Sequence, residues 1–193
     1  RAVREAMDRL NRRLPAGMEL IWVSDNGHFI EATVQSAWLN VAEGIALTAL
    51  ILFLFLYNVR MTIIVAITMP LTILIGLFFM SAADLSLNTS TLLAIGMSVG
   101  ILVTNSIVVL ESIARRLEEK GQPREAAQLG TSQAAIAVLA SAGTNIVVLL
   151  PITVMGSLIG LFMRPFALTM LIMTAVSLFI SFTLTPILCS VLL

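Results

Sequence analysis

The sequence predicts an all-α membrane protein, in which a five-helix transmembrane bundle follows a short helix–strand segment. Of the 193 residues, 59% are hydrophobic and only 11% are charged. Soluble domains carry roughly 25% charged residues, so a bilayer is the expected environment of this chain. Residues 61–83, 85–110, 126–163 and 165–193 contain no charged residue. Each run can supply the ~20 apolar residues that a helix needs to cross a bilayer core.

Residues 1–33 are expected to lie outside the bilayer, as the end of a larger folded domain. Apolar residues recur there at helical spacing, at Val3, Met7, Leu10 and Leu14. The segment "PAG" (15–17) ends this helix, and "MELIWV" (18–23) favours a short strand. One helix and one strand bury too little surface to fold alone, so the chain is interpreted as a piece of a longer polypeptide.

Residues 34–193 are expected to form the transmembrane part. Backbone groups inside a bilayer must be hydrogen-bonded internally, and this requirement favours helices. The predicted spans are approximately 37–57, 62–82, 90–113, 134–156 and 166–188. Kinks are expected at three prolines within or near these spans, namely Pro70, Pro151 and Pro186.

The distribution of Lys and Arg predicts the orientation. Arg60 lies in one connection, and the expected loop 114–133 carries Arg115, Arg116, Lys120 and Arg124. Alternation of the spans places both connections on one side, which the positive-inside rule makes cytoplasmic. Residues 1–33 then lie on the opposite side, because their five arginines are balanced by five acids and folded domains cross largely regardless of charge.

The most informative stretch is "GILVTNSIVVLES", residues 100–112, where Thr104 and Asn105 lie deep in an apolar run. At ~1.5 Å per residue, this pair lies near the middle of the bilayer. Gly96, Gly100 and Thr104 recur every four residues and predict a ridge against which another helix packs closely. Two interpretations remain open: a functional polar site, or hydrogen bonds that simply join helices.

A second polar cluster, "SAGTN", places Ser141, Thr144 and Asn145 at a similar depth in the next span. It either joins Thr104 and Asn105 in one buried network, or its side chains bond their own backbone. Glu43, near the outer end of the first span, is a possible further member, although acids at such positions are usually solvated.

No enzyme active site is expected. Glu111 lies near the cytoplasmic end of its span, where its carboxylate can reach water at little cost in free energy. His28 and Cys189 have no partner at metal-ligand spacing, so no metal site is predicted. No cofactor motif or catalytic set is present, and a formal net charge of zero gives no indication of nucleic-acid binding.

Three segments resemble the N-terminal repeat of RND (resistance–nodulation–cell division) efflux transporters, most closely their hydrophobe/amphiphile multidrug branch. They are "PAGMELIWVSDNGHFIEATV", "LYNVRMTIIVAITMPLTILIGLFFM" and "LFMRPFALTMLIMTAVSLFISFTLTPILCSVLL". The resemblance implies that the five spans are helices two to six of twelve, and that residues 1–33 end a periplasmic porter domain. It also implies a bacterial inner-membrane location, contact with membrane lipid, a homo- or hetero-trimer, and a periplasmic adaptor and outer-membrane channel as partners.

In that family, two adjacent acids on helix four carry a proton relay, and the matching positions here are Thr104 and Asn105. Hydroxyl and amide side chains do not titrate in the accessible pH range. One interpretation is therefore an exporter of hydrophobic or amphiphilic compounds whose ion coupling uses another cation or acids elsewhere. The alternative is a transport-inactive paralogue that serves as a structural or regulatory subunit of a hetero-oligomeric pump.

The neutral pair generates a prediction about the rest of the polypeptide. Related pumps place a lysine from the C-terminal repeat against the two acids. A buried ammonium without a counter-charge costs several kcal/mol, so we expect that lysine to be absent from the second half. Reading the full-length sequence checks this, and a lysine retained at the equivalent position contradicts it.

Overall fold

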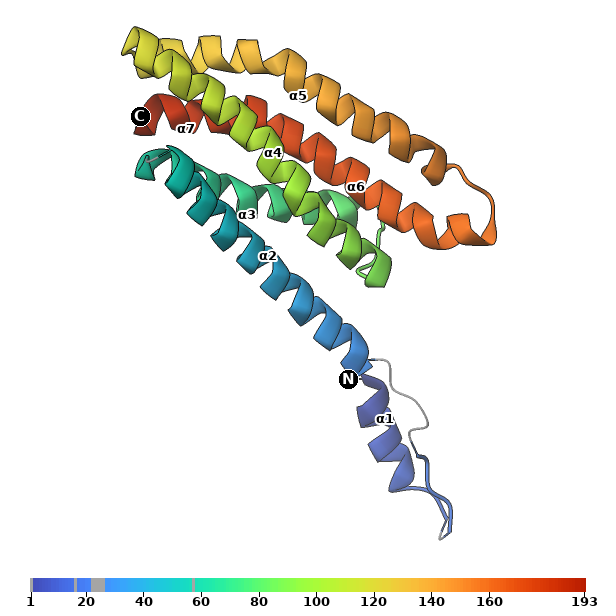
Figure 1. Cartoon of the computed structure of the whole chain (residues 1–193). Coiled ribbons are helices and arrows are strands. Elements are labelled where there is room, and N and C mark those ends of the chain that lie inside the picture. Colours follow the sequence, from blue (N-terminus) through green and yellow to red (C-terminus); the bar gives the residue numbers. More distant parts are fainter. Residues whose placement is uncertain (1, 16, 22–26, 57) are drawn as a thin grey trace. The chain divides into compact units, whose positions relative to one another are not determined.

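The computed structural model describes residues 2–15, 17–21, 27–56 and 58–193. All regular structure in these residues is helical (Figure 1). The helices are α1 (Ala2–Asn11), α2 (Gly27–Leu56), α3 (Val59–Ala82), α4 (Thr89–Lys120), α5 (Pro123–Thr153), α6 (Leu158–Phe182) and α7 (Leu184–Leu192). The chain divides into two compact units, Arg1–Ala32 and Thr33–Leu193.

The first unit contains the predicted helix but not the predicted strand. Residues 18–21 have no regular structure, and residues 22 and 23 of the expected strand lie outside the described residues. The backbone of Leu20 is hydrogen-bonded by a side chain and not by a strand. Asn11 Nδ2 donates to the Leu20 carbonyl at 3.1 Å, and Asn11 Oδ1 accepts from the Leu20 N–H at 2.8 Å. A strand needs a partner strand for its backbone groups, and the described residues supply none.

The second unit confirms a membrane-type bundle. Four helical segments are long and apolar enough to cross a bilayer, at Val59–Ala82, Thr89–Glu119, Pro123–Thr153 and Leu158–Leu192. They match four of the five predicted spans. The first predicted span, 37–57, overlaps α2. Several α2 side chains and residue 57 are outside the described part, so a fifth span stays a prediction.

Within the bundle, α4 and α6 are the central helices, and each contacts α3, α5 and α7 (Figure 1). Buried apolar residues of α3 and α4, including Met69, Ile73, Leu102 and Val109, form most of the core. Large apolar side chains on the outside, such as Ile136 and Phe162, are exposed. An apolar outer surface is what a lipid environment favours.

The expected loop 114–133 is mostly helical, which corrects the prediction. α4 continues to Lys120 and α5 begins at Pro123, so the connection between them is only residues 121–122. Gly121 ends α4 in the left-handed conformation, at φ 69°, and its N–H donates to the Leu117 carbonyl. Pro123 starts α5, where its missing N–H costs nothing. The side of the membrane on which this connection lies stays a prediction.

Proline determines where the last predicted span is interrupted. α6 and α7 are separated at Thr183, three residues before Pro186. A proline ring clashes with the carbonyl four residues earlier, which here belongs to Phe182, so the helix breaks there. Pro70 and Pro151, by contrast, lie inside α3 and α5.

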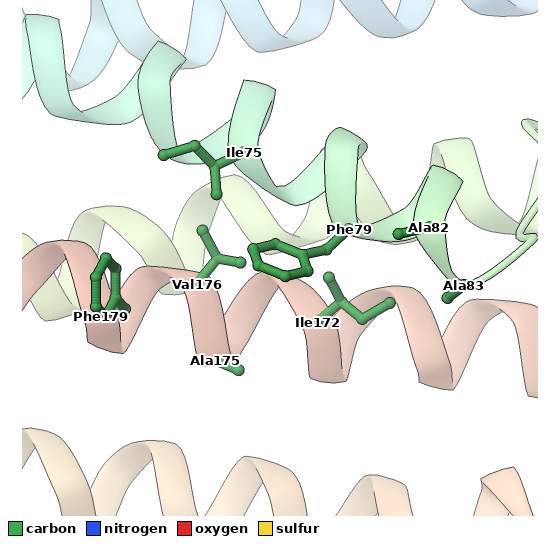
Figure 2. A pocket seen from close by; sticks show the side chains of 8 residues that line it. All are labelled: Ile75, Phe79, Ala82, Ala83, Ile172, Ala175, Val176 and Phe179. Carbon is green, nitrogen blue, oxygen red and sulfur yellow. The ribbon is translucent and has the colours of Figure 1, made fainter.

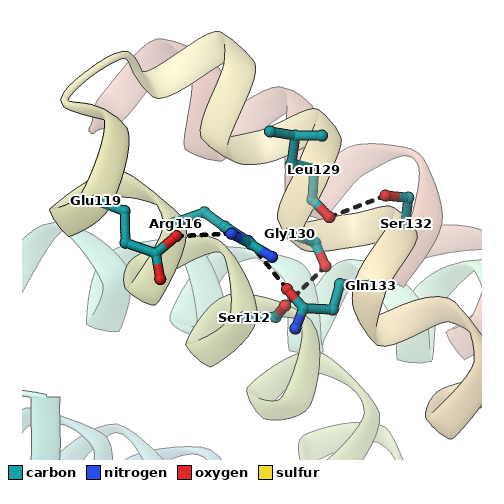
Figure 3. A network of polar contacts seen from close by, with 7 residues as sticks. All are labelled: Ser112, Arg116, Glu119, Leu129, Gly130, Ser132 and Gln133. Atoms are coloured by element: carbon teal, nitrogen blue, oxygen red, sulfur yellow. Dashed lines mark hydrogen bonds and ion pairs between the residues drawn. The ribbon is translucent and has the colours of Figure 1, made fainter.

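Contacts between α4 and α5 hold these helices together at the end that joins them (Figure 3). A Cβ atom added to Gly130 would lie 2.6 Å from the Ile113 Cα, so only glycine allows this approach. Ser112 Oγ donates to the Gly130 carbonyl at 2.8 Å. Arg116 Nε donates to Gln133 Oε1 of α5 at 3.0 Å. Within α4, Arg116 Nη1 donates to Glu119 Oε2 at 2.6 Å. Small residues and polar contacts are the usual basis of helix association in membranes.

This close approach predicts opposite effects for two glycines of α5. Gly130→Ala forces α4 and α5 apart and lowers stability by about 1–3 kcal/mol, the usual cost of overpacking. Gly143 has no atom within 4 Å of an added Cβ. Gly143→Ala is therefore neutral, or stabilises by about 0.5–1 kcal/mol, because alanine favours the helix.

Thermal unfolding of the full-length transporter in detergent measures both effects. A midpoint for Gly130→Ala equal to or above that of Gly143→Ala would contradict the close contact.

Candidate functional site

Asn105 lies in the interior, between α4 and α6. It is 2% exposed, and its Nδ2 donates to Ser177 Oγ at 3.4 Å. Ser177 is also 2% exposed. An amide and a hydroxyl are thus buried together in the middle of the bundle, where each stabilises the other against desolvation.

Asn105 belongs to a polar seam on α4, which we define as Thr91, Ser98, Asn105 and Ser112. Its members recur every seven residues, two helical turns apart, and therefore share one face of α4. The first three are buried. The signal for this seam in the sequence is its seven-residue spacing, which the four-residue spacing of the glycines does not reveal.

The polar seam also fixes the register of α4 against α6. Ser98 Oγ lies 3.1 Å from Met170 Sδ and donates to the Ala94 carbonyl at 2.7 Å. Ser98 and Met170 are 72 residues apart, as are Asn105 and Ser177. Equal separations mean that α4 and α6 run parallel in constant register over the middle of the polar seam, whereas Ser112 bonds α5.

Thr104, next to Asn105, points elsewhere. It is exposed, and its Oγ1 donates to the Gly100 carbonyl in the preceding turn at 2.9 Å. Gly96 and Gly100 are exposed too, and no atom lies within 4 Å of a Cβ added to either. Gly96 lines a groove together with Thr33 and Ser36 of α2, and the role of this ridge in close packing stays a prediction. The glycines that do pack closely are Gly130 and Gly44 against α4 and Gly76 against α6.

The second polar cluster is not joined to the first by any hydrogen bond between described residues. Ser141 and Thr144 are exposed, and Asn145 is half-buried. Thr144 Oγ1 donates to the Ala140 carbonyl at 2.9 Å. Thr104 and Thr144 therefore follow the alternative in which each side chain bonds its own helix backbone.

The titratable residues considered from the sequence lie apart from Asn105. Glu43 is exposed on α2. Glu111 is exposed as well and pairs with Arg115 at 3.4 Å, four residues along α4. Cys189 is buried in α7, and the side chain of His28 lies outside the described residues. No carboxylate of the described chain therefore accompanies Asn105 in the interior.

Further hydroxyls lie beyond Ser177 in a position that the sequence analysis missed. Ser181 and Thr185 follow Ser177 at four-residue intervals, are fully buried, and have no hydrogen-bond partner among the described residues. A buried donor without a partner costs about 1–3 kcal/mol. Such groups are normally satisfied by water or an ion, so this column of α6 and α7 is suited to hold either. Its signal in the sequence is the repeated Ser/Thr in "SLFISFTLTP".

A separate apolar groove lies between α3 and α6 (Figure 2). Its volume is about 580 Å³. α3 contributes Ile75, Phe79, Ala82 and Ala83, and α6 contributes Ile172, Ala175, Val176 and Phe179. None of these side chains forms hydrogen bonds, so the groove suits an acyl chain or another apolar surface and offers no ligand for an ion.

Comparison with known proteins identifies the family. The family model described as "AcrB/AcrD/AcrF family" matches residues 1–193. The multidrug resistance protein MdtC of Salmonella typhi is 37% identical over 188 residues, and MdtC of Escherichia coli (strain K12) is 36% identical over 189. MdtC of Shigella sonnei (strain Ss046) is also 36% identical. Each alignment covers 97% of this chain and 18% of the relative.

The chain thus spans about a fifth of the length of these relatives. The match along its whole length agrees with the sequence resemblance and with the apolar helical bundle. The chain belongs to the AcrB/AcrD/AcrF family of RND multidrug efflux transporters.

Proposed function

We propose that this chain is the first-half transmembrane part of an ion-driven exporter of hydrophobic or amphiphilic compounds, in which a neutral Thr–Asn pair replaces the acid pair of helix four. The observation that carries the proposal is Asn105, which is buried at the α4–α6 contact beside Ser177. Its interior position is where a coupling group has to lie, because it must be shielded from bulk water on both sides of the membrane.

The chemistry of this position disfavours protons as its ligand. Amide and hydroxyl groups neither gain nor lose a proton in the accessible pH range. Their oxygens are, however, hard neutral ligands that suit sodium. Asn105, Ser177 and the unpartnered Ser181 supply such oxygens along one side of α6. Coupling is therefore to a cation held by neutral oxygens, or to acids elsewhere in the full-length protein.

A second candidate function is a transport-inactive subunit of a hetero-oligomeric pump. The hydrogen bonds of Thr104 and Asn105 favour it, because both are bonds that a purely structural role would also make. In this reading, Asn105 only joins α4 to α6, at about 0.6 kcal/mol per contact, and Thr104 bonds its own helix.

The family supports a wider set of proposals about location and partners. We place the protein in the bacterial inner membrane, with residues 1–33 periplasmic and the α4–α5 connection cytoplasmic. We further propose a homo- or hetero-trimer in contact with membrane lipid, joined to a periplasmic adaptor and an outer-membrane channel. MdtC, to which the chain is similar, carries the name of a multidrug resistance protein.

Reconstituted vesicles separate the coupling hypotheses. The full-length transporter is expected to export an amphiphilic dye under a sodium gradient at equal pH, and to respond to a pH gradient only through acids outside this chain. If the wild type exports under both gradients, and substitution of Asn105 alters neither export rate, the coupling site lies elsewhere in the protein. Absence of export under either gradient favours the inactive subunit.

Substitution of Asn105 tests the site itself. Asn105→Leu removes the amide while keeping a similar volume, and we expect export to fall at least tenfold while the protein still inserts and assembles. Thr144→Val is the matched control, because Thr144 bonds only its own helix and lies on the outside. Export rate is measured at equal amounts of assembled protein. An Asn105→Leu variant that exports like the control would show that the pair serves packing alone.

A further inference from the structure

A second groove, between α5 and α7, combines a cation with apolar walls. Its volume is about 380 Å³. Its polar lining includes Arg124, Gln128 and Ser190, and its apolar lining includes Phe182, Pro186 and Ile187. No carboxylate is among the described residues that line it. The groove thus differs from the wholly apolar groove between α3 and α6.

The two kinds of lining are separated along the groove. α5 and α7 run in opposite directions, so the start of α5 lies beside the end of α7 (Figure 1). Arg124 and Ser190 therefore lie at the end of the groove nearest the α4–α5 connection. Phe182 lies toward the middle of the bundle. The arrangement places a charge at the membrane surface and apolar walls at greater depth.

Two further features of the groove favour an anion, and they act against one nearby carboxylate, Glu125 in the first turn of α5. Arg124 lies in the first turn of α5, where the unpaired backbone N–H groups and the helix dipole give a partial positive charge. Thr131, about two turns further along α5, also lines the groove, and its Oγ1 is buried without a partner in the described part of the chain. A buried hydroxyl of this kind is a donor that lacks an acceptor.

We propose that this groove binds an anionic phospholipid. The phosphate lies against Arg124 and the first turn of α5, and one acyl chain follows the wall formed by Phe182, Pro186 and Ile187. Phe182, at the end of α6, and Pro186 and Ile187 of α7 line the groove on both sides of the helix break at Thr183. The proposal requires that the chain lies in a bilayer, and it does not depend on the coupling ion.

A photoactivatable phosphatidylglycerol tests the proposal on the full-length transporter in vesicles. We expect cross-links within residues 182–190, and at least fivefold fewer with a phosphatidylcholine probe of the same acyl chains. Arg124→Gln is expected to lower the phosphatidylglycerol yield about fivefold, the factor that corresponds to about 1 kcal/mol per basic residue at an anionic surface. The matched control, Arg164→Gln, removes another exposed arginine and is expected to leave the yield unchanged.

A second variant tests the apolar wall separately. Ala135 lines the groove. Ala135→Trp fills the groove and is expected to abolish the cross-links of both probes. Equal yields of the two probes in the wild type, or no loss with Arg124→Gln, would overturn the proposal. Cross-linking of an Ile187→Cys variant to another segment of the transporter, in place of lipid, would also overturn the proposal, because a protein helix then occupies the groove.

Discussion

The packing of α4 against α5 and α6 is the constraint on which the rest of the bundle depends. In a bilayer, apolar side chains gain little by leaving lipid for one another, so helices associate through close backbone approach and polar contacts. Gly130 supplies the first of these at Ile113, and the polar seam of α4 supplies the second against α6. With both neighbours fixed, the rotation of α4 is fixed as well. That rotation places Asn105 inside the bundle and Thr104 on its surface.

This rotation gives two adjacent residues different environments. Asn105 contacts Ser177 in the interior, whereas Thr104 bonds only the preceding turn of its own helix. Where an acid pair would place two titratable groups, this chain places one buried amide and one outward hydroxyl. The unpartnered hydroxyls of Ser181 and Thr185 extend the polar interior along α6 and α7. The chemistry available to the site is therefore that of neutral oxygen ligands and water.

Much of the fold follows from local patterns. The charge-free runs predict four of the helices. Pro186 correctly marks an interruption. The strand expected at 18–23 is wrong over residues 18–21, because a strand depends on a neighbour that the local sequence does not contain. The connection is shorter than the expected loop 114–133, because charged side chains do not by themselves end a helix.

By itself, the sequence determined that the chain forms a membrane-type helical bundle, the approximate position of four of its spans, and that positions 104 and 105 carry no charge. Only the tertiary structure decided which residues meet: Ser177 with Asn105, and Gly130 with Ile113. The reason is physical. In a soluble protein, the polar face of a helix marks the outside, but lipid is as apolar as the core, so hydrophobic periodicity does not say which face turns inward. That choice depends on the neighbouring helices, and they are known only once the chain has folded.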